Sequence, residues 1–150
     1  MRLSQKVSAL AVAALAPLGV AILAGPASAA GPTQDFFVCK NMTGSCHPTD
    51  YTYGTITWNT LGQPTISGSV FKPANTSYIV QAVFDAFIAD DPTRVESQGR
   101  TVSGTATKRG FSFPSGLTYR IARIRVTVCI YATSTSTPTC GPYVSYYRPS

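Results

Sequence analysis

The stretch from Tyr119 to Tyr147 constrains the fold most strongly, because apolar and polar residues alternate along its first half. Arg123, Arg125 and Thr127 each lie between apolar residues, and this period of two is that of a strand with one buried and one solvated face. The residues expected in the core are Ala122, Ile124, Val126, Val128 and Ile130. The run Ser134–Pro138 is expected to reverse the chain, so that a second, tyrosine-rich strand pairs with the first.

The N-terminal segment has the pattern of a secretory signal peptide. A basic head precedes the apolar run Val7–Ala24, and a small-residue motif ends at Ala29. We expect cleavage after Ala29 or Ala30, so that residues 1–29 are removed and residues 30–150 form one secreted, extracellular domain. An uncleaved anchor is the alternative, but no later stretch is long and apolar enough to span a bilayer.

In a small chain that is expected to be exported, four cysteines predict two disulfides. Each of the pairs Cys39–Cys46 and Cys129–Cys140 flanks a segment rich in turn-forming residues, so we expect these two local bonds. A metal site is the competing interpretation, but the sequence has no CxxC pair and a single histidine. We therefore expect neither a metal nor another cofactor.

The remaining chain shows strand signals at roughly ten-residue spacing and no credible helix. Trp58, Phe111 and Phe113 are expected in the core, and Gly68 is expected to mark a close approach or a bulge. The polar segment Arg94–Lys108 is expected to form two short edge strands. The other predicted strands are Asp35–Cys39, Tyr51–Trp58, Thr65–Phe71 and Tyr78–Ala89. Eight or nine short strands predict an all-β fold, a single immunoglobulin-like antiparallel β-sandwich with two local disulfides.

In general pattern the chain resembles the small exported immunoglobulin-like sandwich proteins of actinobacteria. The resemblance rests on the Ala-rich signal segment, the two expected local disulfides and the Thr- and Tyr-rich strands. It covers the whole mature chain and implies a bacterial, extracellular protein. It contains no diagnostic motif, so it implies no ligand and no functional residues.

The chain offers few groups for catalysis. His47 is the only histidine, and its place beside a cysteine is more typical of a loop than of a triad. Asp90, Asp91 and Glu96 would allow a calcium site or a glycosidase pair, but an Asp-Asp-Pro sequence is typical of a solvated turn. No nucleophile elbow, zinc motif or phosphate-binding loop is present. We therefore expect no enzyme activity.

Arginine and tyrosine residues are the better candidates for a binding surface. Tyr51 and Tyr53 share one strand face, and flat rings with polar tips suit contact with carbohydrate or protein. The register that the Cys129–Cys140 bond sets places Arg123 opposite Tyr146, and a bulge at Gly141–Pro142 would shift it by one residue. Under the unshifted register Arg125 lies opposite Val144, and the basic residues Arg120 and Arg148 lie nearby. A solvated face that discourages aggregation is the alternative.

These features favour a small secreted, non-enzymatic binding protein. With the signal peptide removed, ten basic residues remain against six acidic ones, a net charge of about +4. The expected site is a basic and aromatic sheet face that includes Arg123, Arg125, Tyr146, Tyr51 and Tyr53. Its partner is expected to be an extracellular protein or a cell-wall or carbohydrate ligand, with no nucleic acid and no membrane anchor. The alternative is a secreted protease inhibitor or antibacterial effector that acts through a disulfide-braced loop, Lys40–Ser45 or Thr133–Thr139.

Overall fold

The computed structural model describes residues 31–41, 50–60, 62–89, 93–115 and 120–150. These residues form nine strands and no helix, so the prediction of an all-β chain is confirmed. The strands are β1 (Thr33–Cys39), β2 (Tyr51–Thr57), β3 (Thr65–Phe71), β4 (Ile79–Ile88), β5 (Arg94–Val102), β6 (Lys108–Pro114), β7 (Ile121–Tyr131), β8 (Thr139–Cys140) and β9 (Val144–Tyr147).

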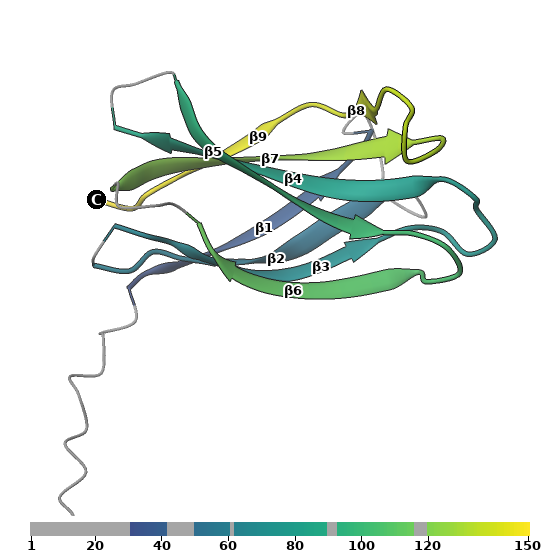
Figure 1. Cartoon of the computed structure of the whole chain (residues 1–150). Coiled ribbons are helices and arrows are strands. Elements are labelled where there is room, and N and C mark those ends of the chain that lie inside the picture. The colour runs from purple at the N-terminus through teal and green to yellow at the C-terminus, as the bar shows by residue number, and fades with distance from the viewer. Residues whose placement is uncertain (1–30, 42–49, 61, 90–92, 116–119) are drawn as a thin grey trace, which may run out of the picture.

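The strands form two antiparallel sheets that face each other, as in a β-sandwich (Figure 1). The four-stranded sheet has the order β1-β2-β3-β6. The five-stranded sheet has the order β5-β4-β7, and β8 and β9 both pair with β7. The chain passes from one sheet to the other after β3, β5 and β6. Because side chains alternate along each strand, every sheet has an inner face toward the core and an outer face toward solvent.

The core lies between the two inner faces. Trp58 and Phe113 are both buried in it, as predicted. Gly54 and Gly68 are partners on adjacent strands, and a Cβ atom at Gly54 would lie only 2.9 Å from the ring of Phe36. Gly54 therefore leaves room for that ring. A Cβ atom at Gly68 would lie 2.1 Å from the backbone oxygen of Tyr53, so Gly68 marks a close approach of the β2 and β3 backbones and not a bulge.

β7 is the central strand of the five-stranded sheet, and it differs from the prediction at its start. Ala122 is not part of the core, and Ile121 is fully buried instead. The register between β4 and β7 shifts between Phe87 and Ile88, which turns the first residues of β7 relative to the rest. The other predicted residues are confirmed as core or as packed against it: Ile124, Val126, Val128 and Ile130.

β5 forms one continuous edge strand, so the prediction of two short strands in the segment Arg94–Lys108 is wrong. β5 pairs with β4 along its length, with a single register shift between Ala86 and Phe87. The chain turns only after β5, at Gly104, whose φ of 64° lies in the left-handed region that favours glycine.

A disulfide joins Cys129 in β7 to Cys140 in β8, as predicted. Cys46, the predicted partner of Cys39, lies outside the described residues, and so does the predicted signal peptide, residues 1–29. The bond fixes the second arm of the hairpin against β7.

Between Cys140 and β9, the strand that runs opposite β7 contains one extra residue, and this shifts the register of all the β7–β9 pairs by one. The β9 pairs are Arg123–Tyr147 and Arg125–Ser145 in place of the predicted Arg123–Tyr146 and Arg125–Val144. The predicted unshifted register is therefore wrong, and the alternative with a shift near Gly141 is confirmed. A shift of one residue turns every side chain to the other face of the strand, so it decides which tyrosine accompanies the arginines.

Candidate binding surfaces

The outer face of the five-stranded sheet carries an alternating row of rings and guanidinium groups, which we call the cation–π ladder: Tyr147, Arg123, Phe87, Arg125 and Tyr143. The Arg123 guanidinium carbon lies 4.1 Å from the centre of the Phe87 ring and 6.0 Å from that of Tyr147. The Arg125 carbon lies 4.8 Å from the centre of the Phe87 ring and 4.0 Å from that of Tyr143. All four distances are in the range of attraction between a cation and a ring face.

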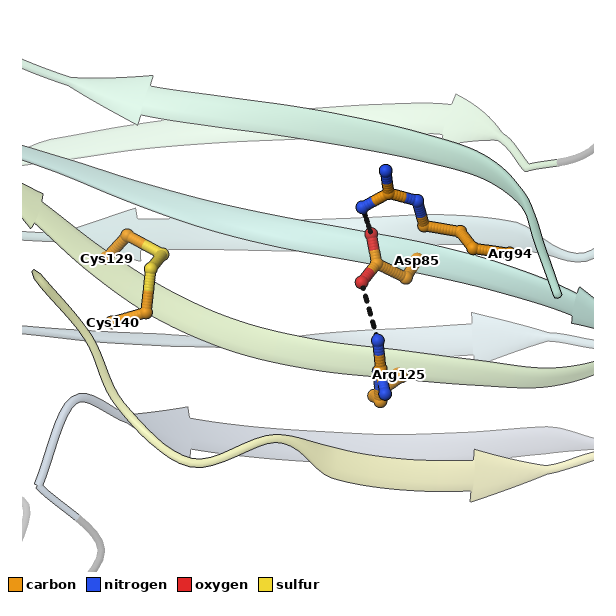
Figure 2. A network of polar contacts seen from close by, with 5 residues as sticks. All are labelled: Asp85, Arg94, Arg125, Cys129 and Cys140. Carbon is orange, nitrogen blue, oxygen red and sulfur yellow. Dashed lines mark hydrogen bonds and ion pairs between the residues drawn. A yellow bond between two sulfur atoms is a disulfide. The ribbon is translucent and has the colours of Figure 1, made fainter. Parts of the chain in front are cut away.

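A buried carboxylate lies beside the ladder (Figure 2). Asp85 belongs to the outward-facing residues of β4, yet its side chain is fully buried. It pairs with Arg125 at 3.3 Å and with Arg94 at 3.4 Å, and these guanidinium groups shield it from solvent. A buried carboxylate is tolerated only when it is paired, so the two arginines stabilise the sheet as well as charge its surface.

The ladder leaves one guanidinium group available. Arg123 has no hydrogen bond or ion pair to any residue that the structure describes, and only its ring contacts hold it. Among the described charges of this face, Arg94, Arg123 and Arg125 stand against Asp85, which leaves a net charge of +2. The face is therefore basic, and its free N–H donors are held in a fixed plane.

The outer face of the four-stranded sheet has a different aromatic group, which we call the aromatic cluster: Phe37, Tyr51, Tyr53 and Phe71. Tyr51 and Phe71 stack with ring centres 4.6 Å apart, and Tyr53 stacks on Phe71 at 5.4 Å. Phe37 lies 5.5 Å from Tyr51 at a tilt of 33°. Lys108 lies 5.2 Å from the centre of the Phe71 ring and ends the cluster on that side.

Hydroxyl groups cover the neighbouring part of the same face. Thr55 donates a hydrogen bond of 3.0 Å to Asp35, and the hydroxyls of Ser67 and Ser112 are 2.9 Å apart. Asp35, Thr55, Ser67 and Ser112 form one continuous row across the four strands. Asp35 and Lys108 are the charged residues on the outward positions of these strands, so the face is close to neutral.

The structure separates the residues that the sequence predicted as one site. Arg123 and Arg125 lie together on the five-stranded sheet, whereas Tyr51 and Tyr53 lie on the outer face of the other sheet. The core fills the space between these two outer faces. A single ligand therefore cannot contact all four of these residues on one face.

Tyr146 belongs to neither outer face. It is half-buried against the core, with its ring 6.2 Å from that of Phe36. Burial raises the pKa of Tyr146, and a hydrogen bond with the Phe37 backbone partly opposes this rise. Tyr146 thus connects the edge of β9 to the edge of β1, and Tyr147 takes the predicted place beside Arg123.

Arg148 is occupied by contacts within the protein. Its guanidinium group donates hydrogen bonds of 2.9–3.0 Å to the backbone carbonyls of Asn59, Gly62 and Ile121. It also lies 5.2 Å from the centre of the Trp58 ring, and burial lowers its pKa. These contacts fasten the C-terminal segment to the loop between β2 and β3, so Arg148 has a structural role.

Most residues of the other predicted sites lie outside the part of the chain that the structure describes. His47, Asp90 and Asp91 lie outside the described residues, as does most of the candidate loop Lys40–Ser45. The second candidate loop, Thr133–Thr139, is an exposed turn in which Ser136 and Thr133 bond to each other. Within the described ranges, no group of three or more His, Cys, Asp or Glu side chains is placed to hold a metal ion.

Sequence reasoning missed several residues of the two surfaces. Asp85 and Phe87 both belong to the residues of β4 that face outward, and the alternation along this strand could have identified them. A phenylalanine in an apolar strand, however, is normally assigned to the core. Phe87 is in fact buried, under arginines instead of under the other sheet. Phe37 and Phe71 were missed because only the register shows that they neighbour Tyr51 and Tyr53.

Two further findings bear on the class of protein. In the part of the chain that the structure describes, no helix has the length and apolar character needed to cross a membrane. Comparisons with protein-family models, with curated proteins and with solved structures find no match to this chain.

Proposed function

We propose that this protein is a secreted, non-enzymatic binding protein that recognises an anionic cell-surface polymer through the cation–π ladder. The observation that supports this most is Arg123, whose guanidinium group is held between two rings and has no acidic partner among the described residues. Guanidinium groups form paired hydrogen bonds with carboxylate and phosphate oxygens, the groups that give extracellular polymers their negative charge.

The rigidity of the ladder favours affinity. A flexible arginine loses side-chain entropy when it binds, whereas Arg123 is already held by Phe87 and Tyr147. Tyr143 and Tyr147 remain 47% and 60% exposed and add apolar area at the two ends of the ladder. The net positive charge of the face also accelerates encounter with an anionic polymer.

We further propose that the sandwich is immunoglobulin-like. The order of β3, β4, β5, β6, β7 and β9 supports this, because β3 pairs with β6, β4 with both β5 and β7, and β7 with β9. These pairings follow strands B, C, C′, E, F and G of that fold. β2 then takes the place of strand A, and β1 is an additional strand. The chain departs from antibody domains in two respects, since Trp58 follows β2 and the Cys129–Cys140 bond lies within one sheet.

Retention on immobilised polyphosphate and polyglutamate tests the proposed function. Arg123→Ala is expected to lower retention about tenfold, because it removes the free guanidinium group from a site where charged hydrogen bonds contribute about 1.5–3 kcal/mol. Arg109→Ala is the matched control, because it removes the same charge from an exposed position on the other sheet. Equal losses in the two variants would show that only net charge matters and would refute the role of the ladder.

A further inference from the structure

We infer that the outer face of the four-stranded sheet is a second binding surface, for a neutral polysaccharide. It lies on the opposite side of the molecule from the cation–π ladder, and its ligand chemistry is different. The inference goes beyond the proposed function, because neither surface needs the other in order to bind.

Two aromatic side chains of this face are widely exposed to solvent. Phe37 is 50% exposed and Tyr53 is 41% exposed, although both are large aromatic side chains on a regular sheet. They are partners on adjacent strands, so their side chains lie next to each other. Exposed rings that neighbour each other form an apolar patch, and such patches on a soluble domain mark contact surfaces.

The rings of the aromatic cluster pack against one another in a fixed arrangement. Tyr51 and Phe71 are stacked at 9°, and Phe37 and Tyr53, the more exposed rings, pack beside them. Lys108 covers one end of this stack, whereas Phe37 is at the other end, on the edge strand β1. Phe37 and Tyr53 are therefore fixed in place before any ligand arrives, and this lowers the entropy lost on binding.

Hydrogen-bonding side chains lie beside the rings of the aromatic cluster. A sugar ring has an apolar C–H face and a rim of hydroxyl groups, and it therefore needs an aromatic surface together with hydrogen-bonding groups. The row Asp35, Thr55, Ser67 and Ser112 supplies such groups directly next to the cluster. Successive strands are about 4.8 Å apart, so these groups form an evenly spaced row of hydrogen-bond donors and acceptors across the sheet.

The outer face of the four-stranded sheet is close to electrically neutral. The outward positions of these strands carry one carboxylate, Asp35, and one ammonium group, Lys108, at different rows of the sheet. A face of this kind gains little from a charged polymer, whether acidic or basic. The combination of rings, hydroxyls and near-neutrality therefore favours an uncharged, hydroxyl-rich polymer over an anionic one or an acidic protein.

Electrophoresis in gels that contain hydroxyethylcellulose, laminarin, galactomannan or soluble starch tests this inference. At least one of these neutral glycans is expected to retard the wild-type protein, with little change between low and high salt. Phe37→Ala combined with Tyr53→Ala is expected to weaken the retardation at least tenfold. Tyr143→Ala, an equally exposed tyrosine on the other sheet, is expected to leave it unchanged.

A second variant guards against misfolding of the aromatic double variant. Ser112→Ala removes one exposed hydroxyl without touching a ring and is expected to weaken retardation two- to fivefold. The inference is overturned if none of the four glycans retards the wild type, or if the folded double variant is retarded like wild type. It is equally overturned if sedimentation shows a dimer that the double variant abolishes, because the cluster would then bind a second copy of this chain. Loss of polyphosphate retention in Arg123→Ala bears on the proposed function alone.

Discussion

The two outer faces of this sandwich both combine aromatic and cationic side chains, but they are built differently. On the five-stranded sheet, Arg125 covers a buried carboxylate and a buried ring, so the surface charge is part of the folded structure. On the four-stranded sheet, Phe37 and Tyr53 are about half-exposed and pack against the rings of Tyr51 and Phe71. Substitutions on the first face should therefore affect stability and binding together, whereas substitutions on the second should affect mainly binding.

Replacing the buried carboxylate is expected to have the largest effect. Asp85→Ala should lower the free energy of unfolding by about 3 kcal/mol, because it removes two charge-assisted hydrogen bonds to a fully buried carboxylate, each of which contributes about 1.5 kcal/mol or more. Asp35→Ala is the matched change on the other face and should cost about 0.5 kcal/mol, because that carboxylate is exposed. Urea denaturation measures both values. Similar costs for the two variants would break the distinction between the faces.

Removing the disulfide should have the next largest effect. Cys129→Ala combined with Cys140→Ala opens a loop with a sequence separation of 11 residues and should cost about 2–3 kcal/mol. The arm that carries Tyr143 and Tyr147 would also be held less firmly against β7. We therefore expect weaker retention on polyphosphate but unchanged retardation by neutral glycans. Equal loss of both activities would show that the faces are not independent.

Arg123→Ala should have a smaller effect on stability, about 1 kcal/mol, because it removes two partly exposed cation–π contacts. Arg123→Lys keeps the charge but loses the planar donor group, so its retention on polyphosphate should fall between wild type and the alanine variant. Thermal unfolding gives the stability change and column retention gives the binding change. Retention of Arg123→Lys equal to wild type would mean that the planar group is not needed.

Phe37→Ala should have the smallest effect on stability, within about 0.5–1 kcal/mol, because half of this side chain is already exposed. Its expected effect is on glycan binding, where the loss should be several-fold. Paired melts and affinity gels measure the two quantities on the same sample. A large loss of stability would show that the aromatic cluster is structural, like the ladder.

Local patterns predicted most of the fold, because a period of two fixes which side chains face the core. The alternation from Ile124 to Ile130 and the Cys129–Cys140 bond were both predicted correctly. The errors occurred where a single residue is inserted, at Ala122 and between Cys140 and β9. Such shifts depend on pairing with a distant strand, which no local pattern contains.

The candidate surfaces were harder to predict, because they combine residues from strands that are distant in sequence. Arg123 and Arg125 could be recognised from one strand, but their partners Asp85 and Phe87 lie about 40 residues earlier in the chain, and only the β4–β7 register brings them together. For the same reason Tyr51 and Tyr53 were assigned to the arginine surface, although they lie on the other sheet.

NMR mapping of a bound polyphosphate would show directly whether the cation–π ladder is the site that binds an anionic polymer. The amide and side-chain signals of the ¹⁵N-labelled protein would be followed while a short polyphosphate is added. If the cation–π ladder binds the polymer, the largest shifts will cluster at Arg123, Arg125, Tyr143 and Tyr147, and the signals of the aromatic cluster will remain unchanged. Shifts of equal size at exposed basic residues of the other sheet, such as Lys108 and Arg109, would show that the polymer binds wherever the surface is positively charged.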